Sequence, residues 1–469
     1  MESRLFQQDR TVSRKLKRRA QGSIVRLGTV ARRLPVLLAV LLFLPVVAQA
    51  AEKNRFNLPD TPTAPRFKVT DKTWPQKIGE AEICLWHEDK LAALSLGVDD
   101  NIGTDIDWWK EQTAPYDVKV TWFVISGKVD RNRSTGYWKQ FRELDQLGHG
   151  VESHSVTHLH MADPGWGGSA WTYEGSLAAT AAQRAAANPP AGVDEAEAGA
   201  PVNKASTPSP GETVGAPTQP AAPKPAVRPP LPTITLTPEE IERGINWEYA
   251  ESIAQLDKNI PGKQVSALAY PGGGFTKYND RKIAAKYFRV ARGARSTQNM
   301  ANMIDYLSLN AESNWDFGDS KYGWVNPRNI LDPKLYGGRY YRGWAILFSH
   351  QANKPLVVKT LEFIKENREA LWVGLLIDVS KYGQERDTAT LKVESPGPDK
   401  ITFLLTDEMD DSYFNFPLTV KVRIPNEWKD VAASQGDKAL KATILQHDGS
   451  AYALVQAVPD AGLVSLTGK

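Results

Sequence analysis

Apolar runs with the composition of buried strands alternate along this chain with stretches of helical spacing. The runs from Ile83 to Val98 and from Val118 to Ser126 are rich in aliphatic and aromatic residues and contain no proline. After them, Tyr137–Leu147 spaces its apolar side chains as a helix does. Strands and helices that alternate at such intervals predict an α/β fold around a parallel sheet.

The second half of the chain continues this alternation and then changes. Strands are expected at Val265–Ala269, Phe288–Ala291, Trp344–Ser349 and Leu371–Ile377, and helices at Pro238–Lys258 and Val357–Asn367. After about Gln384 short strands follow one another with turns between them. They are expected at Ile401–Leu405, Leu418–Ile424, Ala442–Gln446, Ala451–Val455 and Val464–Leu466. We therefore expect a small all-β sandwich, an accessory domain, over 386–469.

The first fifty residues have the order of a secretory signal peptide. A basic segment precedes the 14-residue apolar run Leu34–Val47, and Ala48–Ala50 supplies a cleavage site of small residues. The run is short for a membrane span, and an uncleaved N-terminal anchor is the alternative. We expect a signal peptide at 1–50 that is cleaved near Ala50, export to the periplasm or the extracellular space, and no stable membrane span after cleavage.

Charge is distributed unevenly between this segment and the rest of the chain. Residues 1–50 contain ten Lys or Arg and two Asp or Glu, so the remainder is acidic although the formal charge of the whole is +3. An acidic body argues against nucleic acid as a partner, because phosphate binding needs a basic surface. The single cysteine, Cys84, excludes an internal disulfide and a cysteine-rich zinc module.

Composition also divides the rest of the chain. Residues 51–78 are rich in Pro, Thr and Lys and are expected to form an extended lead-in. In 181–230, 14 residues are Ala, 11 are Pro and none is aromatic. Such a segment buries too little apolar surface to offset the entropy of ordering. We therefore expect a disordered insertion at 176–235, inside a domain that spans 79–385.

Residues that can carry chemistry follow three of the expected strands. Asp99 and Asp100 end the first, His154 and His158 lie four residues apart in HSVTH at a second, and His350 ends a third. Barrel and open-sheet enzymes build their sites at such strand ends. Taken singly, each group has a plain structural explanation: a helix-capping acid pair, a polar loop with chance histidines, and a structural histidine.

Together the three strand ends can supply a metal site. Asp100, His154 and His158 make a set of two histidines and one carboxylate with positions open for water and substrate. If HSVTH is helical, both imidazoles lie on one face. Neighbouring residues in an extended chain point apart, so one Asp can bind a metal while the other faces a substrate. Asp99 is then the candidate base and His350 the candidate acid.

These residues resemble the motifs of the polysaccharide deacetylase family, which is carbohydrate esterase family 4 with its NodB-homology domain. The family's Thr-Phe-Asp-Asp motif is matched by Gly97–Asp100, and its His-Ser/Thr-x-x-His motif is matched in full by His154–His158. Its Arg-x-Pro-x-Gly motif is matched in part by Ala269–Gly273. Its motif of a strand that ends in His is matched by Ile346–His350. The resemblance covers about 80–165 and 236–385, and the spacing fits once the insertion is removed.

The resemblance implies a distorted (β/α) barrel of about seven strands, interrupted by the insertion and followed by the sandwich. It implies hydrolysis of acetyl groups from an acetylated polysaccharide or oligosaccharide, usually the N-acetyl group of a glucosamine unit. It implies one divalent metal, most often zinc. The implied roles are metal binding by Asp100, His154 and His158, base catalysis by Asp99, protonation of the leaving amine by His350, and oxyanion stabilisation by the backbone N–H of Gly272.

Two positions depart from the family pattern. Ala269 stands where the family often has an arginine that holds the catalytic Asp, and Arg292 or Arg295 is a candidate to supply that charge. The family also has an Asp near a Trp that orients the acid histidine. Its nearest match here is Asn314–Asp316.

Aromatic residues near the motifs favour a glycan cleft, because aromatic faces stack on sugar rings. We expect Trp109, Trp166, Tyr270 and Pro271 to contact the substrate. Two other interpretations stay open: an O-acetyl esterase acting on xylan or another acetylated glycan, and a non-catalytic glycan-binding barrel. The presence of Asp99 and of all three metal ligands argues against the second. Chitin oligomers, poly-N-acetylglucosamine, peptidoglycan and xylan all remain as substrates.

Overall fold

The computed structural model describes residues 61–158, 238–273, 280–318 and 325–468. The segments expected to be a signal peptide (1–50) and an insertion (176–235) lie outside these residues. None of the helices in the described part of the chain combines the length and the apolar character that crossing a bilayer requires.

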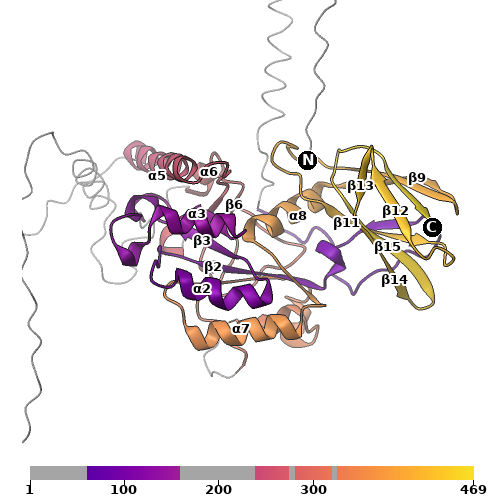
Figure 1. The fold of residues 1–469 in the computed structure, drawn as a ribbon, viewed down its shortest axis with the longest axis horizontal. Coiled ribbons are helices and arrows are strands. Elements are labelled where there is room, and N and C mark those ends of the chain that lie inside the picture. Colours follow the sequence, from indigo (N-terminus) through magenta and orange to yellow (C-terminus); the bar gives the residue numbers. More distant parts are fainter. Residues whose placement is uncertain (1–60, 159–237, 274–279, 319–324, 469) are drawn as a thin grey trace, which may run out of the picture. The chain divides into compact units, whose positions relative to one another are not determined.

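A parallel sheet forms the centre of the fold (Figure 1). Its order is β6-β5-β4-β3-β2-β7, and β8 also pairs with β2. The longest strands, β2 and β7, are buried along their whole length, which is typical of parallel strands covered on both faces. The strands are β2 (Ala92–Val98), β3 (Val120–Val124), β4 (Gly150–Ser153), β5 (Ala267–Ala269), β6 (Val290–Arg292), β7 (Trp344–Ser349) and β8 (Leu371–Val373).

The two edges of this sheet are joined through the segment from Leu309 to Glu312. Leu309 forms a parallel bridge with Arg292 of β6, and Glu312 forms one with Leu347 of β7. The backbone N–H of Glu312 donates to Ile346 O at 3.0 Å. The ring of strands is thereby closed, irregularly, and the distorted barrel expected from the sequence is confirmed.

Helices surround the barrel strands and complete one hydrophobic core with them (Figure 1). Three of them lie where helical spacing predicted them, at 138–146, 238–259 and 354–366. The predicted strand Leu371–Ile377 is wrong in its second half, because the chain turns at Gly374 and a helix begins at Leu376. The helices are α2 (Ile106–Thr113), α3 (Trp138–Gln146), α5 (Pro238–Asn259), α6 (Asp280–Ala284), α7 (Lys354–Glu366) and α8 (Leu376–Thr388).

The C-terminal part of the chain forms two antiparallel sheets, which confirms the predicted sandwich. One sheet has the order β1-β11-β15-β14 and the other β13-β12-β16-β10-β9. The strand β1 (Ala81–Ile83) precedes the barrel in sequence but pairs with β11. The remaining strands are β9 (Thr390–Pro396), β10 (Lys400–Thr406), β11 (Leu418–Ile424), β12 (Val431–Gln435), β13 (Lys438–Leu440), β14 (Ala442–His447), β15 (Ser450–Ala457) and β16 (Val464–Gly468).

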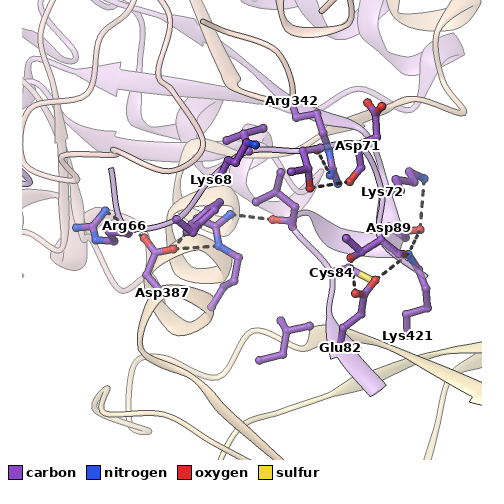
Figure 2. Close-up of a pocket in the computed structure, with 17 residues that line it drawn as sticks. Arg66, Lys68, Asp71, Lys72, Glu82, Cys84, Asp89, Arg342, Asp387 and Lys421 are labelled. Atoms are coloured by element: carbon purple, nitrogen blue, oxygen red, sulfur yellow. Dashed lines mark hydrogen bonds and ion pairs between the residues drawn. The ribbon is translucent and has the colours of Figure 1, made fainter. Parts of the chain in front are cut away.

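The described part of the lead-in, 61–80, contains no helix or strand, yet it is bonded to the rest of the fold. It lines a cavity of about 410 Å³ whose walls are rich in charged side chains (Figure 2). Arg66 pairs with Asp387 at 3.4 Å, and Lys72 pairs with Asp89 at 3.4 Å. Cys84 also lies here, and burial raises the pKa of its thiol well above the ordinary value, so the thiol stays protonated and unreactive.

Candidate metal centre

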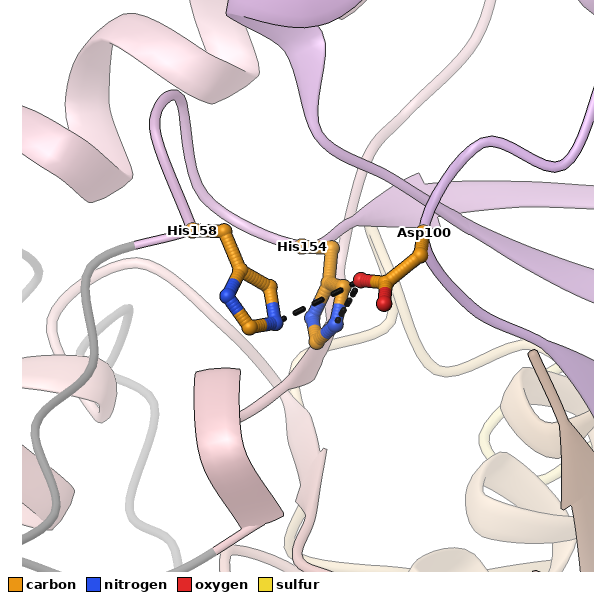
Figure 3. A group of neighbouring side chains, drawn as sticks. All are labelled: Asp100, His154 and His158. Carbon is orange, nitrogen blue, oxygen red and sulfur yellow. Dashed lines mark ion pairs between the residues drawn. The ribbon is translucent and has the colours of Figure 1, made fainter. Parts of the chain in front are cut away.

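The three strand ends singled out in the sequence meet at the carboxyl end of the barrel. Asp100 lies two residues beyond β2, and His154 directly follows β4. Asp100 Oδ1 is 3.4 Å from His154 Nε2 and 3.4 Å from His158 Nε2 (Figure 3). The structure therefore brings together the carboxylate and the two imidazoles predicted to hold a metal.

The chemistry of these donors fits one divalent cation. His154 Nδ1 lies 2.8 Å from Ala269 O, so it is the proton-bearing nitrogen, and Nε2 keeps its lone pair toward Asp100. Asp100 Oδ1 is buried and receives no hydrogen bond. Ligand atoms held at about 2.0–2.1 Å by one tetrahedral ion lie about 3.4 Å apart, which matches the two separations at Asp100 Oδ1. Two histidines and a carboxylate suit zinc and similar ions.

The charge state of Asp100 also suits a metal ligand. Burial alone would raise its pKa. The interaction with His154, together with the charges of His158 and His350, outweighs burial and holds the pKa of Asp100 well below its usual range. The carboxylate is therefore ionised at neutral pH and ready to bind a cation.

The ligands sit on strained backbone rather than on a helix, so the two imidazoles converge without sharing a helix face. Ser155 and His158 both have φ of 62°, and Asp100 and Asn101 have φ of 64° and 55°. Left-handed conformations in non-glycine residues cost energy and persist where the surroundings impose them. Here they turn three side chains from two segments, the turn after β2 and the loop after β4, toward one point.

Asn101 fixes the turn after β2, a role that the sequence analysis missed. Its side-chain N–H donates to Ile125 O at 2.9 Å, and its side-chain oxygen accepts from Ile125 N at 2.6 Å. This pair of bonds ties the end of β2 to the end of β3. The signal was present in the sequence, because Asn tolerates the left-handed region better than most residues and it directly follows Asp-Asp.

Asp99 is buried beside this group and is held by an arginine. Its carboxylate forms an ion pair with Arg292, and both side chains are almost fully buried, with exposures of 3% and 1%. The guanidinium lies between the rings of Phe123 and Phe348, with centroids 4.7 and 4.0 Å away. Arg292 thus occupies the role proposed for either of two arginines, while Arg295 lies on the surface.

The two remaining candidates border the site. His350 follows β7 with half of its side chain exposed, and its Nε2 is 3.8 Å from Asp100 Oδ2. Gly272 follows β5 in an exposed turn with φ of 73°, a conformation that favours glycine. Both positions can be reached by a substrate at the strand ends.

The aromatic residues predicted to bind substrate are not on the site surface. Trp109 lies on α2 with 2% of its surface exposed and belongs to the barrel core. Tyr270 is 1% exposed and its hydroxyl donates to Leu307 O at 3.0 Å; Pro271 is buried as well. The structure places these three side chains in the packed core, and their contact with substrate stays a prediction. Trp166 lies outside the described residues.

The Asn314–Asp316 segment does not serve as the missing partner of His350. Trp315 is buried, and its indole N–H donates to Thr360 Oγ1 of α7 at 2.9 Å. Among the described residues, the carboxylate within 4 Å of the His350 ring nitrogens is that of Asp100.

A parallel barrel with two histidines and a carboxylate converging at its strand ends, and a second carboxylate beside them, is typical of metal-assisted hydrolases. Residues 113–187 match the family model described as polysaccharide deacetylase. Over this segment the chain is therefore similar to the polysaccharide deacetylase family.

Several known proteins are similar to parts of this chain. A gellan lyase of a Bacillus species is 30% identical over 420 residues, which is 84% of this chain but 13% of that protein, so this chain spans a small part of its relative's length. A Streptococcus pyogenes deacetylase solved with acetate shares 17% identity over 46% of this chain and 62% of that chain, with a TM-score of 0.27. A carbohydrate esterase family 4 pseudoenzyme from Bacillus anthracis shares 13% identity over 61% of this chain and 65% of that chain, with a TM-score of 0.29.

Proposed function

We propose that this protein is an exported, metal-dependent deacetylase that hydrolyses acetyl groups from a glycan, most favourably the N-acetyl group of a glucosamine unit. One observation carries the proposal. Two adjacent carboxylates have separate environments: Asp100 faces the two histidines, and Asp99 is buried against Arg292. That division supports one carboxylate as a ligand and the other as a base.

The residues that would hold the cation are Asp100, His154 and His158. A divalent cation at this position supplies Lewis-acid activation of a water and of the acetyl carbonyl. Asp99 accepts the proton that the attacking water loses. Arg292 orients that carboxylate through their ion pair, because its guanidinium is buried and fixed between two aromatic rings.

His350 and Gly272, at the border of the site, act on the leaving group and on the developing oxyanion. His350, when protonated, donates its proton to the leaving nitrogen, which is otherwise too basic to depart. The backbone N–H of Gly272 donates to the oxygen on which negative charge develops. Exposure of half of the His350 side chain leaves room for a sugar at the leaving-group side.

An O-acetyl esterase is the second candidate, and one observation favours it. Among the described residues, His350 pairs with no carboxylate other than the metal ligand Asp100. An ester leaving group needs less help from an acid than an amine does, so a loosely held His350 suits ester hydrolysis better. A non-catalytic barrel is less well supported, because Arg292 supplies the positive charge that the motif lacks at Ala269.

Acetate release from a panel of glycans tests the proposal. The panel contains chitin oligomers, poly-N-acetylglucosamine, peptidoglycan and acetylated xylan, with gellan added because of the name of the Bacillus relative. Wild type should release acetate from at least one of them and contain about one divalent metal per chain. Asp99→Asn should keep the metal and lose acetate release by ~100-fold or more.

His154→Ala provides the complementary variant and should lose the metal as well as the activity. Full metal content in His154→Ala, or near-normal turnover in Asp99→Asn, would refute the assigned roles. Preference for acetylated xylan over N-acetylated polymers would select the esterase. A mature N-terminus close to Ala51 in the exported fraction tests secretion.

A further inference from the structure

The segment Ser153–His158, here called the metal-binding loop, places two of the three predicted ligands. It leaves the end of β4, has no regular structure beyond Ser153, and contains left-handed residues at Ser155 and His158. Because that backbone is strained, its shape must be imposed by what bonds to it.

The N–H groups of this loop all find partners, and one side chain takes two of them. Glu248 Oε2 accepts from Val156 N and Thr157 N, both at 2.9 Å. Glu248 Oε1 accepts from Thr157 Oγ1 at 2.7 Å. Of the other N–H groups beyond Ser153, His154 N donates to Val124 O of β3 at 2.9 Å. Ser155 N and His158 N donate within the loop, to Ser153 Oγ and Ser155 Oγ, each at 3.1 Å.

Neighbouring backbone holds the loop from the opposite side. Ser126 N and Gly127 N, just after β3, donate to Ser155 O and Val156 O at 3.1 and 3.0 Å. A Cβ on Gly127 would lie 2.7 Å from Val156 O, so only glycine allows this approach. The loop is thus clamped between the end of β3 and α5, and the carboxylate of Glu248 is the charged member of the clamp.

Glu248 is buried, with 2% of its surface exposed. Burial raises the pKa of this carboxyl, while the bonds from Thr157 and Val156 act in the opposite direction and favour the ionised form. Hydrogen bonds to an ionised acceptor are about twice as strong as those between neutral groups, and burial keeps water from competing. Successive N–H groups that point at one anion are a backbone arrangement that favours negative charge. The contacts of Glu248 are therefore strong enough to hold strained backbone.

We propose that Glu248 is a positioning residue of the metal centre. Its carboxylate fixes the loop in the conformation in which His154 and His158 face Asp100, without touching metal or substrate itself. The inference rests on the proposed function in so far as that function requires a metal. Outer groups that orient ligands usually contribute 10–100-fold to metal affinity.

Zn²⁺ affinity tests the proposal independently of turnover. The variants are Glu248→Gln, which keeps the shape and removes the charge, and Glu248→Ala, which removes all three bonds. The matched control is Glu242→Gln, the same change on the same helix at a side chain that is 56% exposed and paired with Lys286. Competition against a chromophoric chelator gives the Kd, and melting with and without Zn²⁺ gives the stability of each form.

We expect the Kd to weaken by ~10-fold in Glu248→Gln and by up to ~100-fold in Glu248→Ala, with Glu242→Gln unchanged. The Zn²⁺-induced rise in Tm should shrink in the same order. A lower Tm in chelator with an unchanged Kd would show a merely structural role and overturn the proposal. If Glu248→Ala does not fold, Glu248→Gln decides the question.

Failure here is distinguishable from failure of the proposed function. A wild-type chain that binds no Zn²⁺ refutes the metal centre and this inference with it. A wild-type chain that binds Zn²⁺, loses affinity in Glu248→Gln and releases no acetate supports the inference and refutes the deacetylase.

Discussion

Arg292 shows how a single side chain restores a charge that the motif sequence lacks. The strand β6 ends at this residue, and strand alternation places it on the same side as Val290, toward the aromatic residues inside the barrel. Asp99, which directly follows β2, meets it there. A buried pair of this kind is costly to break from one side, because the remaining charge is left without a partner.

We expect Arg292→Met to lower the free energy of unfolding by about 3–5 kcal/mol, since it strands the Asp99 carboxylate. The double variant Asp99→Asn/Arg292→Met should lose less than the sum of the two single variants. Urea unfolding of all four proteins measures this coupling. Arg295→Met, at the exposed neighbour, is the control and should change stability by no more than about 0.5 kcal/mol. If the losses of the two single variants add up to the loss of the double variant, the pairing of Asp99 with Arg292 is contradicted.

The sequence predicted the need for such a charge but not its source, and the reason is local. Arg292 and Arg295 are close in sequence, and only the end point of β6 decides which one faces the interior. A strand predicted at 288–291 but found at 290–292 shifts that end by one residue. Asp100 was predictable because Asp-Asp directly follows the strongly apolar strand β2, and His154 and His158 were predictable from their four-residue spacing in HSVTH.

Among the helices, α8 was not predicted from the sequence. The run LWVGLLI has no periodicity that separates a strand from a helix, and Gly374 divides the two. Side chains of this helix form hydrogen bonds with three other segments. Tyr382 OH donates to Cys84 O at 2.7 Å, and Gln384 Nε2 donates to Arg289 O at 3.3 Å. Glu385 Oε1 accepts from Phe416 N at 3.0 Å. It connects the segment after β1, the residue before β6 and the sandwich.

The buried carboxyl of Glu385 makes stability depend on pH. Burial, and next the negative charge of Asp407, raise its pKa from 4.5 to about 9. Between pH 4.5 and about 9 the folded protein therefore keeps a proton on Glu385 that the unfolded chain has lost. The free energy of unfolding falls as the pH rises through this range. Glu385→Gln should be more stable than wild type by a margin that grows with pH.

Melting temperatures of wild type and Glu385→Gln across that interval check the sign. The difference should be smallest near pH 4.5 and largest near pH 9. A difference that stays constant, or that shrinks with rising pH, would show that Glu385 is ionised in the folded protein.

On the scale of the whole chain, barrel and sandwich share a core. One hydrophobic cluster contains Phe123 and Trp344 of the barrel together with Phe403, Val420 and Leu466 of the sandwich. Composition and strand spacing predicted both parts, but no local signal shows that β1 leaves the barrel segment to join β11. Pairing between distant segments depends on packing, which periodicity does not encode.

A shared core predicts that the two parts unfold together. Phe403→Ala leaves a cavity in the sandwich and should cost about 3–5 kcal/mol. Hydrogen exchange of barrel peptides in β2 and of sandwich peptides in β11 should then accelerate by the same factor. Faster exchange confined to the sandwich would mean that the barrel holds its structure alone.

The pairing of β1 with β11 bears on the order in which parts of this chain fold. Lys421, on β11, donates to Thr73 O of the lead-in, 348 residues away in the sequence. A chain made from its N-terminus has β1 long before it has β11, and contacts between segments so far apart form slowly. During that time β1 is an unpaired strand edge, the kind of surface on which chains associate wrongly. Barrel strands close to one another in the chain, such as β2 and β3, can pair earlier, so we expect the attachment of β1 and the lead-in to the sandwich to be a late step of folding.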